Sequence, residues 1–171
     1  MNKILSIIFF IVLLFSGAYS QSYYVKIQDL QKVNDSKYIF SIYIGSENKI
    51  KLSAYMGSIS FNQGLKIDTI KYIPGTCAFK NNIQYNSILT DDNVKEFVFA
   101  SEEDKFSDLI YDTPVLLGKF EIIKKSGFKD KRPKFNLAWN FSGDFYTAIL
   151  GTNYKDITDY FIFKTTKYQE K

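Results

Sequence analysis

Acidic side chains that could do chemistry gather in three short stretches, at residues 90–93, 101–104 and 142–144. A glycoside hydrolase would need two facing carboxylates, drawn here from Asp91, Glu102 and Asp144, but their spacing does not favour such a pair. Calcium takes about six to eight oxygen ligands, and none of the stretches has an Asp-x-Asp-x-Asp-Gly spacing. We therefore expect no catalytic residue, no metal site and no cofactor, with a structural calcium ion as the less favoured alternative.

The sequence contains no histidine and one cysteine, Cys77. A Ser-His-Asp triad and the usual zinc sites need histidine, and a catalytic thiol normally needs a neighbouring base. A single thiol cannot form an internal disulfide. Cys77 is therefore interpreted as a small buried hydrophobic residue, and most hydrolase chemistries are disfavoured.

The only tryptophan, Trp139, lies in an alternating stretch at residues 135–141. Alternation places it on one face with Phe135 and Phe141. Because large aromatic side chains dominate the cores of β-sandwiches, this pattern predicts that Trp139 is buried rather than displayed as a sugar-stacking platform.

Tyrosines on outward faces are the candidate ligand-binding residues. The chain has 13 tyrosines, and alternation turns Tyr24, Tyr43 and Tyr146 away from the predicted core. A tyrosine ring offers flat apolar area with a hydroxyl that tolerates water, which suits a glycan. Outward tyrosines also serve β-propensity and cross-strand packing, so both interpretations stand.

Residues 1–20 resemble a secretory signal peptide. Lys3 precedes an apolar run of about a dozen residues, short of the roughly 20 that a membrane-spanning helix needs, and Ala18 and Ser20 suit the cleavage site. The mature chain should begin at Gln21. We expect it to be secreted, whether extracellular, periplasmic or associated with the cell surface, without stable membrane insertion after cleavage.

The mature chain has the size and charge of one soluble domain. Cleavage leaves 151 of the 171 residues, which predicts a single domain at 21–171. Loss of Lys3 leaves 21 of the 22 basic residues against 18 acidic ones, spread along the chain. This balance is not that of a nucleic-acid-binding protein.

Period-two alternation runs through almost the whole mature chain. Roughly nine short strands with turn signals between them predict an all-β fold, an antiparallel two-sheet β-sandwich. In residues 50–61 the apolar positions change from even to odd numbers at Gly57, which predicts a β-bulge there.

One short helix is predicted after residue 100. Ser101 is a suitable N-cap, acids fill the first turn, and Phe106, Leu109 and Ile110 share a helical face. We expect this helix to lie over one end of the sandwich. Two Asn-x-Ser tripeptides, beginning at Asn34 and Asn140, match the glycosylation pattern and are interpreted as turn residues.

Three stretches together resemble the cohesin-like β-sandwich modules of secreted Bacteroidota proteins: LSAYMGSISFNQGLKI (52–67), LLGKFEI (116–122) and FNLAWNFSGDFYTAILGTNYKDIT (135–158). Such modules are grouped with cohesins and carbohydrate-binding modules, which act by binding. The resemblance implies a non-catalytic binding or structural module, engaged in protein–protein interaction or adhesion at the cell envelope. A carbohydrate-binding module is the alternative, and a glycoside hydrolase the third. The partner is expected to be a protein or a glycan outside the cell.

Overall fold

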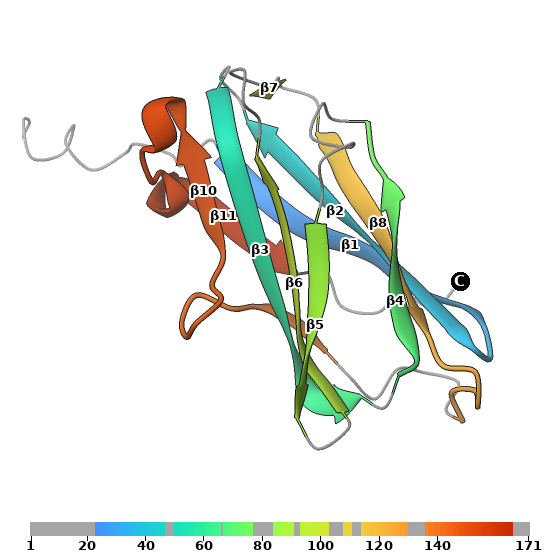
Figure 1. The fold of residues 1–171 in the computed structure, drawn as a ribbon. Helices are drawn as coiled ribbons and strands as arrows, with labels where there is room; N and C mark the ends of the chain where they lie inside the picture. Colours follow the sequence, from blue (N-terminus) through green and yellow to red (C-terminus); the bar gives the residue numbers. More distant parts are fainter. Residues whose placement is uncertain are drawn as a thin grey trace, which may run out of the picture.

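The computed structural model describes residues 23–46, 50–65, 67–76, 84–90, 93–102, 108–110, 114–129 and 136–165 (Figure 1). The elements in chain order are β1 (Tyr23–Asn34), β2 (Lys37–Ser46), β3 (Ile50–Leu65), β4 (Thr69–Pro74), β5 (Gln84–Thr90), β6 (Asn93–Glu102), β7 (Asp108–Ile110), β8 (Val115–Ile123), β9 (Leu137–Trp139), β10 (Ala148–Gly151), η2 (Thr152–Tyr154), η3 (Thr158–Tyr160) and β11 (Phe161–Thr165). The predicted signal peptide and Cys77 lie outside the described residues.

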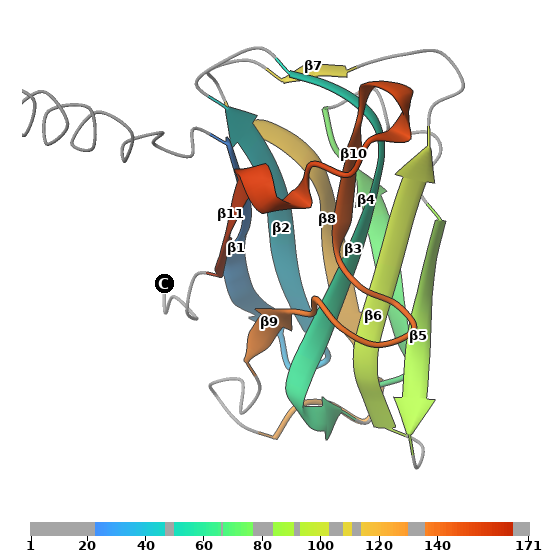
Figure 2. The same ribbon diagram turned by 90° about the vertical axis from the view of Figure 1, so that its left-hand side faces the viewer.

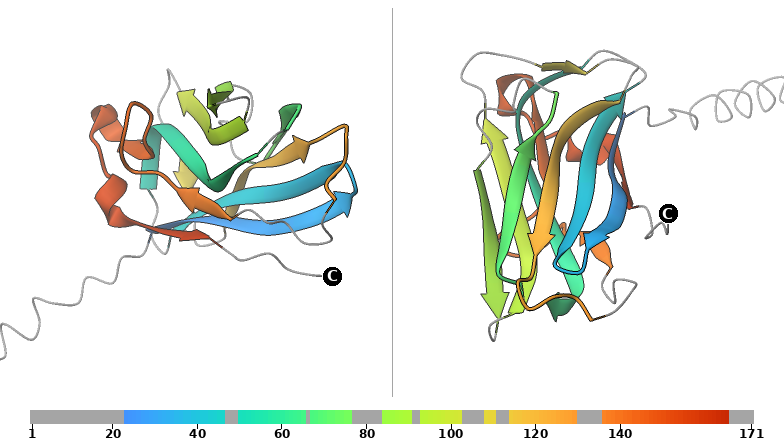
Figure 3. Two further views of the ribbon diagram at one scale, coloured as in Figure 1. Left: turned by 90° about the horizontal axis from the view of Figure 1, so that it is seen from below. Right: turned by 90° about the vertical axis from the view of Figure 1, so that its right-hand side faces the viewer.

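The strands form two sheets packed face to face. Sheet A has the order β11-β1-β2-β8-β4, and sheet B has the order β10-β3-β6-β5, with β7 and β9 also paired to β3. Figure 3 shows the two layers from below. Only the β1–β11 pairing is parallel among the described strand pairs. The predicted all-β sandwich is therefore confirmed.

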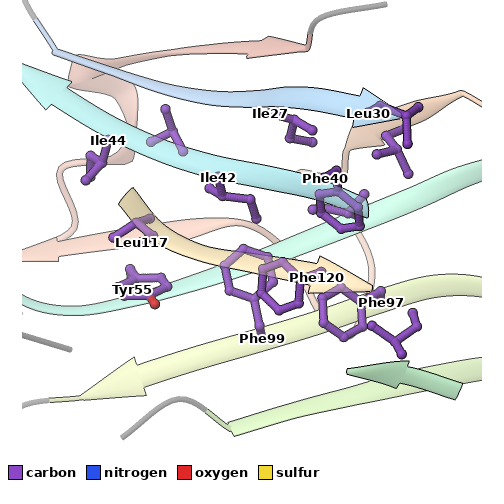
Figure 4. Packing of buried hydrophobic residues seen from close by; sticks show 14 of the residues in the cluster. Ile27, Leu30, Phe40, Ile42, Ile44, Tyr55, Phe97, Phe99, Leu117 and Phe120 are labelled. Atoms are coloured by element: carbon purple, nitrogen blue, oxygen red, sulfur yellow. The ribbon is translucent and has the colours of Figure 1, made fainter. Parts of the chain in front are cut away.

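The core between the sheets is rich in isoleucine and phenylalanine. The Phe120 ring of sheet A lies 4.8 Å from the Phe97 ring and 5.1 Å from the Phe99 ring of sheet B, centroid to centroid. All three side chains are almost fully buried (Figure 4). Aromatic pairs at such distances add about 0.5–1.5 kcal/mol each beyond their area burial, so this cluster joins the two sheets at their centre.

In β3 the core-facing positions change from even to odd numbers earlier than the sequence predicted. Pairing with β6 continues through Gly57 without a shift, whereas the pairing with β10 shifts near Ser53, between Leu52 and Ala54. Gly57 has a different role, because a Cβ there would collide with the ring of Phe99. The missing side chain leaves room for the far end of that ring beside β3.

The helix predicted from Ser101 to Ile110 is wrong where the structure describes these residues. Ser101 and Glu102 end β6, and Leu109 and Ile110 belong to β7. Both strands pair with β3, so sheet extension overrides the helix-cap signal. The described helical segments are the 3-10 turns η2 and η3, and no described helix is long and apolar enough to cross a membrane.

A tight turn joins β1 to β2. The Asn34 side-chain oxygen accepts hydrogen bonds from the backbone N–H and the hydroxyl of Ser36, both at 2.9 Å. This Asx turn agrees with the interpretation of Asn34 as a turn residue. The ammonium of Lys32 lies 2.7 Å from the Asp35 carboxylate and, by hydrogen bonding and charge, lowers the pKa of Asp35 from its usual value.

We expect Asp35→Asn to reduce stability at neutral pH and to lose this effect in acid. A carboxylate with a lowered pKa stabilises the fold above its unfolded pKa, about 3.9, and ceases to do so as the pH falls through the folded pKa. Urea midpoints at pH 7, 5 and 2.5 measure the difference. Asp144→Asn, an exposed acid remote from the turn, is the control. A pH-independent difference for Asp35→Asn would contradict the pairing.

Gly57→Ala should destabilise the protein by about 1–3 kcal/mol, because the added methyl group overpacks the Phe99 ring. Adding Phe99→Leu should recover part of this loss, since the two sites are in contact. Urea unfolding measures both effects. Lys51→Ala, at an exposed position on the same strand, should stay within about 0.5 kcal/mol of wild type, and an equally small effect for Gly57→Ala would refute the packing role.

Candidate binding surface

Two short strands, β9 and β10, pair with the same edge of β3, and a loop separates them. β9 pairs antiparallel with Ile59–Phe61, and β10 pairs antiparallel with residues 52–56 of the same edge. Between them, residues 141–146 leave the sheet; we call this loop the flap. Figure 2 shows it crossing the outer face of sheet B in front of β3 and β6.

Asn140 and Thr147 close the gap that the flap leaves in the ladder. The Ser58 N–H donates to the Thr147 hydroxyl oxygen (3.1 Å), and that hydroxyl donates to the Ser58 carbonyl (3.2 Å). The Asn140 N–H also donates to the Ser58 carbonyl (2.9 Å), and the Thr147 N–H donates to the Asn140 carbonyl (2.8 Å). Ser58 and Thr147 are buried, so these bonds satisfy backbone groups that water does not reach.

A second set of hydrogen bonds holds the flap against β6. The Asn140 side-chain amide donates to Glu96 Oε1 (2.8 Å) and to the Phe145 carbonyl (3.2 Å). The Ser58 hydroxyl donates to the same Glu96 oxygen, and Asn140 Oδ1 accepts from the Ser142 N–H (3.3 Å). Asn140 is thus a turn residue with its amide engaged, as the sequence interpretation held.

Exposed aromatic side chains gather along this edge. Among the residues whose side chains the structure describes, the exposed aromatic ones are Phe141, Phe145, Tyr146, Tyr154 and Tyr160, each 45–53% exposed. All five come from the flap or from the turns η2 and η3. Contiguous exposed apolar side chains mark interaction surfaces, so this edge is the candidate binding surface.

The segment after β10 covers the outer edge of that strand. The Ile149 N–H donates to the Thr158 hydroxyl (2.8 Å), and the Ile157 N–H donates to the Ile149 carbonyl (2.9 Å). Asn153 and Tyr154 both have left-handed backbones, with φ of 59° and 56°. A bulky residue such as Tyr154 rarely adopts this conformation, and such strain occurs at functional sites.

Trp139 packs against the core but is only half-buried, so its predicted burial is met in part. Its indole N–H donates to the Lys164 carbonyl (3.2 Å), and its ring lies 5.4 Å from Phe163. The prediction for Phe141 is wrong: the strand ends at Trp139, and Phe141 is 53% exposed, with its ring 4.9 Å from Phe163. Phe135 lies outside the described residues.

The three candidate tyrosines do not form one site. Tyr24 and Tyr43 are half-buried on the outer face of sheet A, whereas Tyr146 is on the flap over sheet B. The sequence reasoning interpreted residues 142–144 as a hairpin turn and 144–150 as a strand, so it missed Phe145, Tyr154 and the rest of the aromatic edge. Gly143, whose φ of 96° favours glycine, agrees with a turn at this position.

Metal-ligating groups do not converge in the described part of the chain, where no three histidine, cysteine or acidic side chains form a cluster. A pocket between the sheets is lined by apolar groups that include Trp139, Phe163 and Ile149, and no carboxylate or lysine borders it. Neither feature offers the paired acids that glycoside hydrolysis requires.

No protein-family model matches the chain, and no curated protein matches it. Solved cohesin structures do. A type I cohesin in a cohesin–dockerin complex from Clostridium thermocellum has a TM-score of 0.54 and 15% identity, over 85% of this chain and 89% of that one. A type II cohesin in an X-dockerin complex from Acetivibrio cellulolyticus has a TM-score of 0.52 and 9% identity, over 84% and 96%.

A third similar structure is the second type II cohesin module of the scaffoldin ScaA from Acetivibrio cellulolyticus. Its TM-score is 0.53 at 7% identity, over 86% of this chain and 96% of that module. At these identities the likeness shows the fold alone. The chain therefore has a cohesin-like fold, in agreement with the resemblance of its sequence to such modules.

Thr147→Val should destabilise the protein by about 1–3 kcal/mol, since it leaves the buried Ser58 N–H without its acceptor while keeping the side-chain shape. Chymotrypsin should also cut the flap faster, because the flap loses one of its two fixed ends. Urea unfolding and timed proteolysis measure these effects. Thr152→Val, at an exposed position, is the control and should match wild type; unchanged flap cleavage in Thr147→Val would refute the role of Thr147.

Proposed function

We propose that this cohesin-like sandwich is a secreted, non-catalytic module that binds a protein at or outside the cell envelope. Its binding surface is the flap with the adjoining aromatic edge of sheet B. The observation that carries the proposal is that the exposed aromatic side chains of the described chain all lie between residues 141 and 160. Aromatic residues are enriched at protein interfaces and supply many of their energetic hot spots.

The flap is held in one shape before any partner binds. Its two ends are fixed by Asn140 and Thr147, and its middle by the bond from Asn140 to the Phe145 carbonyl. A surface that is ordered in advance loses less conformational entropy on association. The aromatic side chains are thus displayed by a loop whose backbone is already bonded to the sheet.

The cohesin structures support a protein partner. Two of those described above are complexes with dockerin proteins. Because the sequence identities are only 7–15%, the partners of those cohesins cannot be assigned to this chain. Secretion is supported by the signal-peptide pattern of residues 1–20.

Glu96, the acid that anchors Asn140 beside the flap, is in a structural role. One oxygen of Glu96 accepts hydrogen bonds from both Ser58 and Asn140. A general acid or nucleophile for glycoside hydrolysis would instead face a second carboxylate across a substrate cleft. This arrangement supports binding rather than catalysis.

The test compares two double variants of residues 21–171 as bait in extracts of the source organism's surface and medium. Phe145→Ser/Tyr146→Ser removes two exposed flap aromatics, and Val33→Ser/Ile73→Ser removes two exposed apolar residues elsewhere. A protein captured by wild type is identified, purified and titrated by calorimetry. The flap variant should bind it at least tenfold more weakly, which is about 1.4 kcal/mol, and the control within about twofold of wild type.

Equal binding by both variants would contradict the assignment of the surface. Capture of a polysaccharide that the flap variant no longer retains, with no protein bound, would replace the protein-binding proposal by a carbohydrate-binding one. Circular dichroism and urea midpoints of both variants establish that each remains folded.

A further inference from the structure

The outer face of sheet A gathers lysines from four strands that are distant in the sequence. They are Lys164 on β11, Lys26 on β1, Lys119 on β8 and Lys71 on β4. Each is exposed or half-buried and follows a residue on the core side of its strand, as Lys26 follows Val25 and Lys164 follows Phe163. Strand alternation therefore directs all four to the outer face.

The register brings two of these lysines directly side by side. Lys26 pairs with Lys164 across the β1–β11 ladder, and neighbouring strands lie about 4.8 Å apart. Like charges directly opposite each other in a sheet are destabilising. The Lys164 ammonium lies 5.9 Å from the centre of the Tyr24 ring, a cation–π contact that offsets part of this repulsion without neutralising the charge.

Among the strand-paired residues of sheet A in the described chain, Glu121 is the only acid. Its carboxylate lies 2.9 Å from the Lys37 ammonium, and Glu121 is also the cross-strand partner of Lys71. Lys26, Lys119 and Lys164 have no acidic cross-strand partner. A cluster of cations on a flat surface with little counter-charge beside it is complementary to a polyanion.

Neutral groups between the lysines suit a sugar chain. Tyr24 lies over Gly45, where a Cβ would come within 2.5 Å of its hydroxyl, so its ring is held against the sheet. Tyr43 is the cross-strand partner of Lys26. Flat aromatic area that carries phenolic hydroxyls fits sugar rings.

We propose that the outer face of sheet A binds an extended polysaccharide carrying carboxylate groups, with Lys26, Lys119 and Lys164 contacting the carboxylates and Tyr24 and Tyr43 contacting the sugar rings. This site lies on the sheet opposite the proposed protein-binding flap and is independent of it. The module would then hold a protein partner on one face and an acidic glycan on the other.

The test uses polygalacturonate as the probe, with fully methyl-esterified polygalacturonate and a double-stranded DNA oligonucleotide as comparison polymers. Affinity electrophoresis and calorimetry of residues 21–171 should show binding to polygalacturonate that weakens at least tenfold between 0.05 and 0.5 M NaCl, as expected for screened charges. The methyl ester, which lacks the charge, should bind at least tenfold more weakly.

Two variants with the same change in net charge locate the site. Lys26→Gln/Lys164→Gln should weaken polygalacturonate binding at least tenfold, whereas Lys51→Gln/Lys155→Gln, at exposed positions outside sheet A, should change it less than threefold. Any of four outcomes would overturn the proposal: equal loss of binding in both variants, equal binding of the methyl ester, preference for DNA, or no binding of polygalacturonate. Retention of polygalacturonate by Phe145→Ser/Tyr146→Ser would separate this site from the flap.

Discussion

The candidate binding surface depends on the hydrogen bonds of a single backbone unit, that of Ser58. At this position the edge strand beside β3 leaves the sheet, and a buried N–H and C=O would be left without partners. Thr147 supplies both an acceptor and a donor from one hydroxyl group, and the Asn140 N–H adds a second donor. Because unpaired buried backbone groups are costly, the chain must leave and re-enter the sheet at these two residues. The flap and its aromatic side chains follow from that constraint.

The two-sheet fold places apolar, aromatic and basic side chains in different parts of the molecule. Alternation places the phenylalanine cluster between the sheets, and it leaves two outer surfaces of different character. One edge of sheet B displays aromatic rings from the flap and the η2 and η3 turns. Sheet A displays lysines with a single strand-paired acid. A net charge that is small and evenly spread along the sequence thus becomes uneven in space, because strands far apart in the chain lie side by side.

The sequence alone was sufficient for the features that depend on local alternation. It predicted the sandwich, the core-facing side of Trp139 and the turns at Asn34 and Asn140. It failed where non-local pairing decides the outcome. Ser101 and Glu102 have good helix-cap chemistry, yet pairing with β3 draws them into β6. The bond from Asn140 to Glu96 spans 44 residues, and no local pattern indicates it. The flap was therefore interpreted as a tight hairpin turn followed directly by a strand, and the lysine face as scattered surface charge.

The central claim, that a protein partner docks on the flap, can be tested most directly by photo-crosslinking in the source organism. A benzophenone side chain placed at position 145, on the flap, or at position 73, on β4 of sheet A, reports which protein lies within reach of each site. The account predicts a specific protein adduct from position 145 and none of the same mass from position 73. Adducts from position 73 alone, or a flap that gives no protein adduct, would contradict it.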